Sequence, residues 1–321
     1  MLNILISLIP LVVLNYQFEV PKVFIFFTVC IFLIFILLFN IKKITFFKRD
    51  IYYLLWLVTL LISGLLSEYP AISILGGSYR HQGLIFFIGL YLLIKYVEIL
   101  TIRQKNNLYK CVGIVVLIES ALVIFGLKIG TIGEINAVAG FLATGFYFVK
   151  VSFPKLLLLL PVISILINFS KSGILALLPY IFKKVNAIWI IALIVSVFVV
   201  KPINTNSQFE SRGVIWKYAI EIINDKPILG HGAESNEALY DKKFLQDSIV
   251  LTNLRIDRAH NLFLDITIWS GLIGLFFFVM FLYESYKISD FDKRQVVFSF
   301  LIYAMFQPLS VVHWILFALV V

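Results

Sequence analysis

His260 lies where a polar stretch of the chain meets a long apolar one, in the string DRAHNLFLDITIWSGLIGL that begins at Asp257. If Asp257 caps the helix predicted here, His260 falls in its first turn, where the helix dipole disfavours the imidazolium form. A neutral imidazole can accept a proton near neutral pH, so this position could supply a general base. A single histidine at such a boundary is also often just a polar residue, and the spacing alone leaves both interpretations open.

Three basic side chains could hold an anion near this position. Arg212 opens a predicted helix, so its guanidinium can reach an anion at that helix N-terminus. Arg80 stands in LGGSYRHQGLIFF, where glycines allow a close backbone approach and the planar guanidinium suits phosphate oxygens. Lys171, in NFSKSGILAL, lies between two apolar runs, where a cation usually faces a protein interior or a wet cavity. Lipid headgroup contact, or snorkelling to the surface, is the alternative for each.

Three further polar side chains are secondary candidates: His81 beside Arg80, Asn136 at the start of an apolar run, and Asn261. Asn136 could bind a sugar hydroxyl or cap its helix, and capping is the simpler interpretation. Asn261 lies four residues before Asp265, so the two share a helix face. The sequence has no HExxH or CxxC pattern and its four histidines are scattered, so neither a metal site nor a cofactor is expected.

The elements that position these side chains are expected to be membrane helices. Of the 321 residues, 61% are hydrophobic and 14% charged, with a mean hydropathy of +1.00, whereas a soluble domain has about 25% charged residues. Apolar runs of roughly the 20 residues needed to cross a bilayer recur, which predicts an all-α polytopic protein with about twelve spans, or ten to twelve. The first run lacks a small-residue cleavage site, which predicts a retained span rather than a signal peptide. Spans are expected near 2–15, 22–40, 51–67, 83–98, 110–127, 136–151, 155–170, 172–184, 186–200 and 260–284, with two short ones in 295–321 broken at Gln307-Pro308.

The expected organisation is a transmembrane bundle over 1–200, a large extracytoplasmic loop over 201–259 and C-terminal membrane helices over 260–321. In the loop, helical spacing predicts an amphipathic helix over 214–223 on the membrane face and a second helix near 235–246. With the N-terminus in the cytoplasm, fifteen of the 27 Lys and Arg fall in inner loops and four in short outer loops. The net charge of +9 therefore indicates membrane topology and not nucleic-acid binding.

In their order along the chain, these pieces resemble the O-antigen ligase superfamily, also called Wzy-C or WaaL-like. The resemblance rests on Arg212 with Trp216, on the turn PILGHG, on His260-Asn261, and on the glycines of the following span. NFSKSG and GSYRHQG resemble two further turns of the family, with Lys171 where arginine is usual.

The resemblance implies a GT-C-like enzyme of the bacterial cytoplasmic (inner) membrane that builds lipopolysaccharide or another cell-envelope polysaccharide. The donor would be a glycan on a polyprenyl (undecaprenyl) pyrophosphate, and the acceptor a hydroxyl of a lipid, glycan or protein. His260 would be the general base of a metal-independent, inverting transfer. Arg212, Arg80 and Lys171 would hold the pyrophosphate, although lysine lacks the bidentate fork of arginine. A ligase, a polysaccharide polymerase and a protein O-oligosaccharyltransferase would share this chemistry.

Glu119, in the middle of a predicted span, favours a different class of function. A carboxylate there must be protonated, paired or hydrated, and it could mark a proton or ion path. A membrane transporter or a lipid-linked glycan flippase is therefore an alternative, although the sequence has no visible two-fold internal similarity. A non-catalytic scaffold, which would not need His260, is a third.

Overall fold

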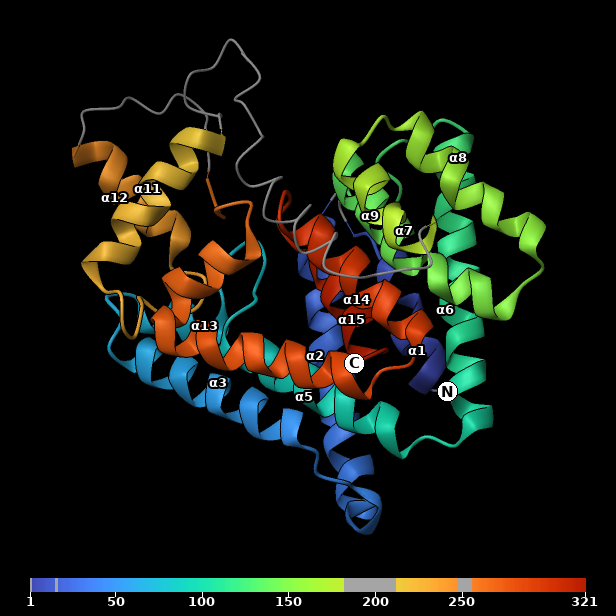
Figure 1. Cartoon of the computed structure of the whole chain (residues 1–321), viewed down its shortest axis with the longest axis horizontal. Helices are drawn as coiled ribbons and strands as arrows, with labels where there is room; N and C mark the ends of the chain where they lie inside the picture. Colours follow the sequence, from blue (N-terminus) through green and yellow to red (C-terminus); the bar gives the residue numbers. More distant parts are fainter. Residues whose placement is uncertain (1, 15–16, 182–211, 247–255) are drawn as a thin grey trace.

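The structure of this chain is a computed structural model that describes residues 2–14, 17–181, 212–246 and 256–321 (Figure 1). In these residues the apolar runs form helices. Among these residues there is no strand, only an isolated bridge between Leu14 and Gln17. The expected all-helical architecture is thus confirmed for the described parts. The elements are α1 Leu2–Leu8, η1 Ile9–Leu11, α2 Val20–Phe39, η2 Ile41–Lys43, α3 Lys48–Leu65, α4 Pro70–Leu75, α5 Leu84–Ile99, α6 Ile102–Ile124, α7 Ile135–Ser152, η3 Lys155–Leu158, α8 Leu159–Ile167, α9 Lys171–Ile181, α11 Arg212–Asp225, α12 Asn236–Gln246, α13 Leu262–Ile288, α14 Phe291–Ala304 and α15 Val311–Ala318.

Four of the described helices, α2, α6, α7 and α13, are long and apolar enough to cross a membrane by length and composition. α3 has 18 residues but starts with Lys48, Arg49 and Asp50, so it is less apolar over that length. The apolar stretches Leu2–Leu11, Lys155–Ile167 and Lys171–Ile181 form shorter helices. The count of about twelve spans therefore stays a prediction. The expected span 186–200 and the loop segments 201–211 and 247–255 lie outside the described residues.

α3 and α13 pack lengthwise against each other and run across the view in Figure 1. Their contact is rich in aromatic rings: the ring of Trp56 lies 4.9 Å from that of Phe278, and the ring of Tyr53 lies 4.8 Å from that of Phe281. Phe87 of α5 joins this cluster, 4.9 Å from Trp56. Because large aromatic side chains bury much apolar area, this cluster fixes α13 against α3 and α5.

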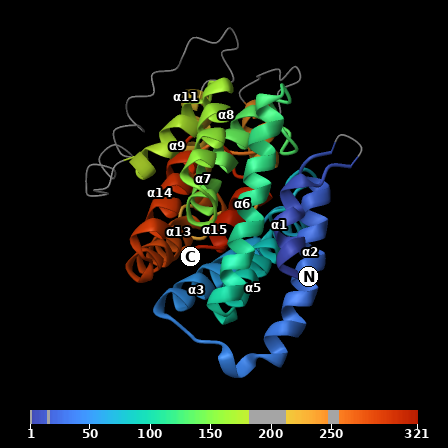
Figure 2. The same cartoon turned by 90° about the vertical axis from the view of Figure 1, so that its right-hand side faces the viewer.

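A second group of helices, α6 to α9 with α14, packs beside the first (Figure 2). α7 contacts α6, α9 and α14. α9 approaches α7 closely at Gly173, where an added Cβ would lie 2.6 Å from the Cβ of Ala139. Small residues allow such approaches between membrane helices. The approach brings the start of α9, with Lys171, to the start of α7.

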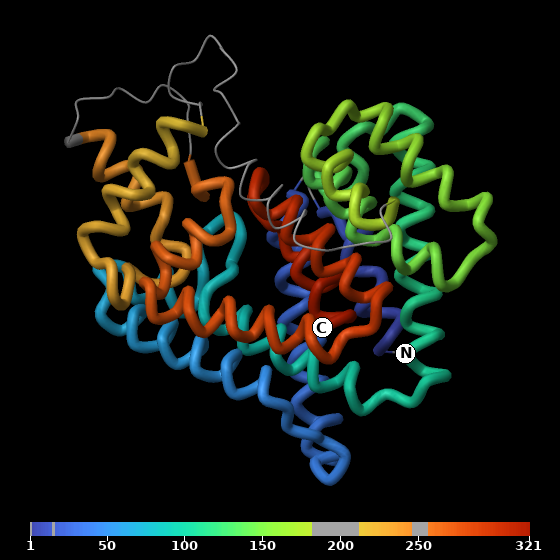
Figure 3. Tube along the Cα trace, in the orientation of Figure 1, coloured from blue at the N-terminus to red at the C-terminus, as the bar shows by residue number. Residues whose placement is uncertain are grey.

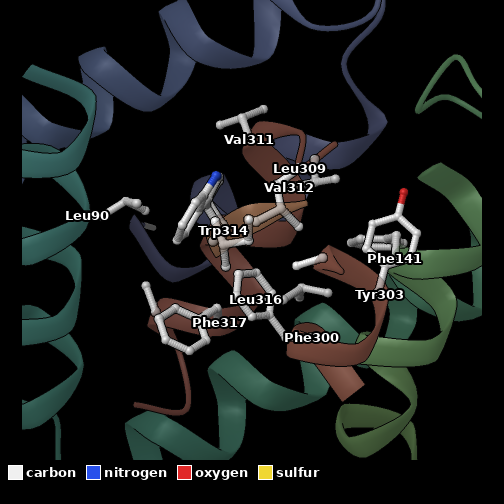
Figure 4. Close-up of a cluster of buried hydrophobic side chains, with 14 of the residues drawn as sticks. Leu90, Phe141, Phe300, Tyr303, Leu309, Val311, Val312, Trp314, Leu316 and Phe317 are labelled. Carbon is white, nitrogen blue, oxygen red and sulfur yellow. The ribbon is translucent and has the colours of Figure 1, made fainter. Parts of the chain in front are cut away.

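The segment from 302 to 321 is buried throughout, and its short helix α15 lies inside the molecule (Figure 3). Trp314 and Phe317 of α15 pack on Phe300 of α14, with ring centroids 5.4 and 4.5 Å apart (Figure 4). α15 has eight residues, about 12 Å of helix, against a hydrocarbon core of about 30 Å. α15 packs as a buried helix, and the expectation of two short spans in 295–321 stays a prediction. The break before α15 falls at Gln307-Pro308, as expected.

Candidate active site

The turn PILGHG (227–232) inserts into a break in α13. Gly271 has φ +64°, so the helix is interrupted there, and an added Cβ would overlap the carbonyl of Ile228. The backbone groups that the break leaves without helical partners bond to the turn instead. This fits the rule that irregular backbone among membrane helices has its polar groups satisfied by protein. The turn is therefore held in place by α13. The bonds are His231 N to Ile268 O (2.7 Å), Gly232 N to Trp269 O (2.9 Å) and Leu272 N to Pro227 O (2.8 Å).

His260 lies just before α13 and not within its first turn. The residue that caps the helix is Asn261, whose Oδ1 accepts hydrogen bonds from Phe263 N (3.1 Å) and Leu264 N (3.2 Å). The expectation that Asp257 is the cap is therefore wrong. His260 has φ +55°, a left-handed conformation that costs free energy in any residue with a Cβ. The surrounding structure must hold the backbone in this form.

Both backbone polar groups of Ala259, the residue before His260, form hydrogen bonds to side chains. Ala259 N donates to Asp265 Oδ1 at 2.8 Å, and Ala259 O accepts from Trp216 Nε1 at 2.9 Å. Asp265 also accepts from Asn236 Nδ2 at 2.8 Å, and Asn236 in turn accepts from the indole of Trp269. These bonds join α11, α12 and α13, so three helices together position the histidine.

Two arginines and one carboxylate lie within electrostatic reach of the imidazole. Burial lowers the pKa of His260 to about 4; Asp257 opposes this effect, while Arg212 and Arg80 add to it. The imidazole is thus neutral at physiological pH, as expected, but the main cause is burial and not a helix dipole. The structure brings together three of the side chains that the sequence singled out: His260, Arg212 and Arg80.

Arg80 and Arg212 differ in how their charge is balanced. Arg80 is buried and its Nε donates to Asp257 Oδ2 at 2.5 Å. Burial alone would raise the pKa of Asp257, but Arg80 and Arg258 hold it below its usual value. The Nη2 of Arg212 donates to the carbonyl of Phe306 at 2.8 Å, and Arg212 forms no ion pair with any described residue. Of the two arginines, Arg212 is thus the one whose charge no described carboxylate neutralises.

The break between α14 and α15 supplies carbonyl groups to both arginines. Phe306 O accepts from Arg212, and Leu309 O accepts from Arg80 Nη1 at 3.4 Å and from Gln82 Nε2 at 3.0 Å. The Gln307-Pro308 turn thus faces the site, a role that its apolar surroundings in the sequence do not indicate.

The other predicted site residues lie around this centre. Lys171 is exposed at the first position of α9. Ser170 donates to Asn136 Oδ1 at 2.9 Å, and Asn136 also bonds to Glu134, which caps α7. Asn136 is therefore not a helix cap. Glu134 lies within electrostatic reach of Arg80, so the start of α7 borders the site.

His81 and Asn261 have local roles. The ring of His81, at φ +50°, lies 5.8 Å from that of Phe24, and the side chain of Asn261 is occupied in capping α13. Contact of either residue with a substrate stays a prediction.

Arg258 is a site residue that the sequence did not single out. It is buried, forms an ion pair with Glu234, donates to Gln82 Oε1 at 3.1 Å and lies 4.5 Å from the ring centre of Trp269. Glu234 accepts from Gly77 N at 2.5 Å. Arg258 thus ties the glycine-rich turn before α5 to the segment that carries His260. A charged residue bordering an apolar run is usually paired inside the protein, and that signal could have identified it.

Beside Arg258 lies a cavity of about 10 Å³, also lined by Gln82, Asp265, Trp269 and Gln307. This volume holds about one water molecule. Arg258 Nη1 is buried without a hydrogen-bond partner. Ordered water could therefore satisfy it.

Glu119 is held by its surroundings in α6. Its carboxylate accepts from the hydroxyl of Thr131 and from Thr131 N at 3.1 Å, and Lys22 lies within electrostatic reach. Lys22 itself donates to Thr131 O at 2.7 Å. A buried carboxylate with these partners has a structural explanation, so it no longer points specifically to transport. Among the described residues, no group of three or more His, Cys, Asp or Glu is placed to hold a metal ion.

Comparison with known proteins places this arrangement in a family. The model of the O-antigen ligase family (Wzy_C) matches residues 82–279, more than half of the chain. The match includes Arg212, the 227–232 turn, Arg258 and His260, and it begins just after Arg80. No curated protein and no solved structure matches the chain. The family comprises membrane-bound, glycosyltransferase-like ligases and polymerases of polysaccharide biosynthesis. The chain therefore belongs to the O-antigen ligase family.

Proposed function

We propose that this protein transfers a glycan from a polyprenyl-pyrophosphate donor to an acceptor hydroxyl at the outer face of the bacterial inner membrane. The observation that carries the proposal is the placing of one neutral imidazole, His260, within electrostatic reach of two arginines. A base and cations in that arrangement suit the displacement of a phosphate leaving group by a hydroxyl.

In the proposed reaction, His260 accepts the proton of the acceptor hydroxyl while its oxygen attacks the anomeric carbon of the donor sugar. The bond between that carbon and the pyrophosphate oxygen breaks, the lipid pyrophosphate leaves with the electron pair, and the anomeric configuration inverts. The protonated imidazole then releases its proton to solvent. No step requires a metal ion.

The anionic donor has a second effect on the base. An imidazole with a pKa of about 4 is neutral but weakly basic. A pyrophosphate beside it favours the protonated form and raises the pKa. Donor binding would therefore strengthen the base at the moment when the acceptor must be deprotonated.

The two arginines are assigned different parts. Arg212, which no described carboxylate neutralises, would bind the pyrophosphate directly and stabilise the charge it gains on leaving. Arg80, paired with Asp257, would contribute mainly through the field it adds and by fixing the His260 segment. Lys171, exposed at the start of α9, would at most contact the donor from the edge of the site.

The three kinds of enzyme that fit this proposal differ in their acceptor. A ligase would transfer to a lipid-linked core, a polymerase to another glycan chain, and a protein O-oligosaccharyltransferase to a serine or threonine hydroxyl. All three require the same base and the same leaving group.

The deciding experiment uses the full chain in detergent with a polyprenyl-pyrophosphate glycan and each acceptor class in turn. His260→Ala should lower transfer by about a hundredfold or more, as expected for loss of a general base, while donor affinity is retained. Arg212→Gln should weaken both. Lys217→Gln, on the exposed face of the same helix, is the charge-matched control and should change neither. Unaltered transfer by His260→Ala would refute the mechanism.

A further inference from the structure

An apolar groove lies at the opposite end of α5 from the site. α5 has 16 residues, about 24 Å of helix. Arg80 precedes its first turn, whereas the groove is lined by α5 from its middle, at Tyr91, to Lys95. The groove has a volume of about 220 Å³ and runs between the C-terminal half of α2, the turn after it and α5. Figures 1 and 2 show this end of α2 projecting beyond the other helices. Side chains that line it include Leu37, Leu38, Ile41, Phe46 and Leu92.

The charged group at the inner wall of the groove is already saturated. Lys95 is buried, and its Nζ donates to Thr45 O at 2.9 Å, Asp50 Oδ2 at 2.6 Å and Glu98 Oε2 at 2.9 Å. An ammonium group has three N–H donors, so none is left for an occupant. Apart from Lys95 and Tyr91, whose hydroxyl is buried without a hydrogen-bond partner, the residues that line the groove are apolar. Most of the surface that a ligand meets in the groove is therefore hydrocarbon.

The turn that borders the groove carries two lysines. Lys42 and Lys43 lie in the η2 turn between Ile41 and Ile44, both of which line the groove. Both lysines are exposed, and neither forms an ion pair with a described residue. An apolar groove beside two lysines that pair with no described carboxylate complements a molecule with an apolar tail and an anionic head.

We propose that this groove binds one anionic glycerophospholipid, with an acyl chain between α2 and α5 and its phosphate against Lys42 and Lys43. A zwitterionic lipid gains less from the two lysines because its headgroup carries no net charge, and a free phosphate cannot use the groove. In the orientation expected from the basic loops, the lipid belongs to the cytoplasmic leaflet. The proposal does not depend on the chemistry assigned to His260.

The test is native mass spectrometry of the full chain in detergent, titrated with phosphatidylglycerol or phosphatidylcholine. The native protein should bind a first phosphatidylglycerol at least tenfold more tightly than phosphatidylcholine. Lys42→Gln with Lys43→Gln should weaken phosphatidylglycerol binding about 25-fold, a roughly fivefold contribution from each lysine, and leave phosphatidylcholine binding unchanged. Leu38→Trp, which fills the groove from an exposed position, should weaken both lipids.

Two controls make the result specific. Arg103→Gln with Lys110→Gln removes the same charge from exposed positions on α6, and Phe35→Trp enlarges an exposed α2 side chain outside the groove lining. Both should bind as the native protein does. Equal affinity of the native protein for the two lipids, an equal loss in the Arg103/Lys110 variant, or displacement of phosphatidylglycerol by inorganic phosphate would each overturn the proposal.

Discussion

At the scale of single residues, His260 combines a left-handed backbone with a neutral, partly buried ring. The first property fixes the direction of the side chain, and the second keeps a proton acceptor available next to two guanidinium groups. The two arginines lower the pKa of the imidazole and at the same time offer sites for an anion that would raise it. These charges would suit the anionic donor proposed above.

The pH dependence of transfer should report this arrangement. In the free enzyme His260 has a pKa of about 4, so it is neutral above about pH 5 and becomes protonated below that. We expect kcat/KM to stay level from about pH 8 to about pH 5 and to fall at lower pH. In the donor complex the pKa is higher, so kcat should begin to fall at a higher pH than kcat/KM. A shared midpoint near 6.5, the value of a solvated histidine, would contradict the effect of burial.

Asp265 should behave as a positioning residue. Asp265→Ala leaves the buried Ala259 N–H without its acceptor, so the left-handed turn at His260 relaxes. We expect kcat to fall about tenfold to a hundredfold, with donor affinity within about twofold of the native value. Asp265→Asn keeps an oxygen acceptor and should recover most of the rate. A similar rate for the two variants, or a parallel loss of donor binding, would indicate general destabilisation instead.

At the scale of elements, the break in α13 links the loop to the membrane helices. The 227–232 turn replaces intrahelical hydrogen bonds, and α12 and α11 follow and precede it along the chain. The same helices supply Asn236 and Trp216 to the bonds that hold the His260 segment. The geometry of the site therefore depends on how well the turn fits the break.

Gly271→Ala should destabilise the protein by more than the cost of a left-handed backbone conformation, because the added methyl group also disturbs the fit of the turn. Gly271 and Gly126 both have positive φ, +64° and +101°, but an added Cβ meets the Ile228 carbonyl at Gly271 and nothing within 4 Å at Gly126. We expect Gly126→Ala to cost about 1–2 kcal/mol of unfolding free energy and Gly271→Ala about 3 kcal/mol or more. Thermal unfolding in detergent measures both. Transfer should fall only in Gly271→Ala, and equal effects would argue against a docking role for the turn.

A helix could be predicted from the sequence where a single local pattern of residues determines it. Apolar runs gave the helices, and the spacing over 214–223 gave α11. The start of α13 was misplaced because Asp257 and Asn261 are both good caps, and Asp257 is instead paired with Arg80, a residue remote in sequence. The break at Gly271 depends on carbonyl groups of the 227–232 turn. The ion pair of Arg258 depends on a carboxylate that the same loop brings to it. Such features arise only from tertiary contacts.

At the scale of the whole molecule, the site and the lipid groove lie at opposite ends of α5. This separation matches the charge distribution, since the exposed lysines of the η2 turn are at the groove end and the His260 segment is at the other. Donor chemistry at one surface and anionic-lipid binding at the other would both orient the protein in the bilayer.

Cysteine labelling should reveal this orientation in whole cells. Cys111 is partly exposed and Cys30 buried, so Cys111→Ser provides a background with little native reactivity. In it, Lys217→Cys on α11, where the side chain is 68% exposed, should react with a membrane-impermeant maleimide in intact spheroplasts. Arg103→Cys, exposed at the start of α6, should react only after permeabilisation, because the basic loops are retained in the cytoplasm. The reverse pattern would put His260 on the cytoplasmic side, where the proposed transfer at the outer face could not occur.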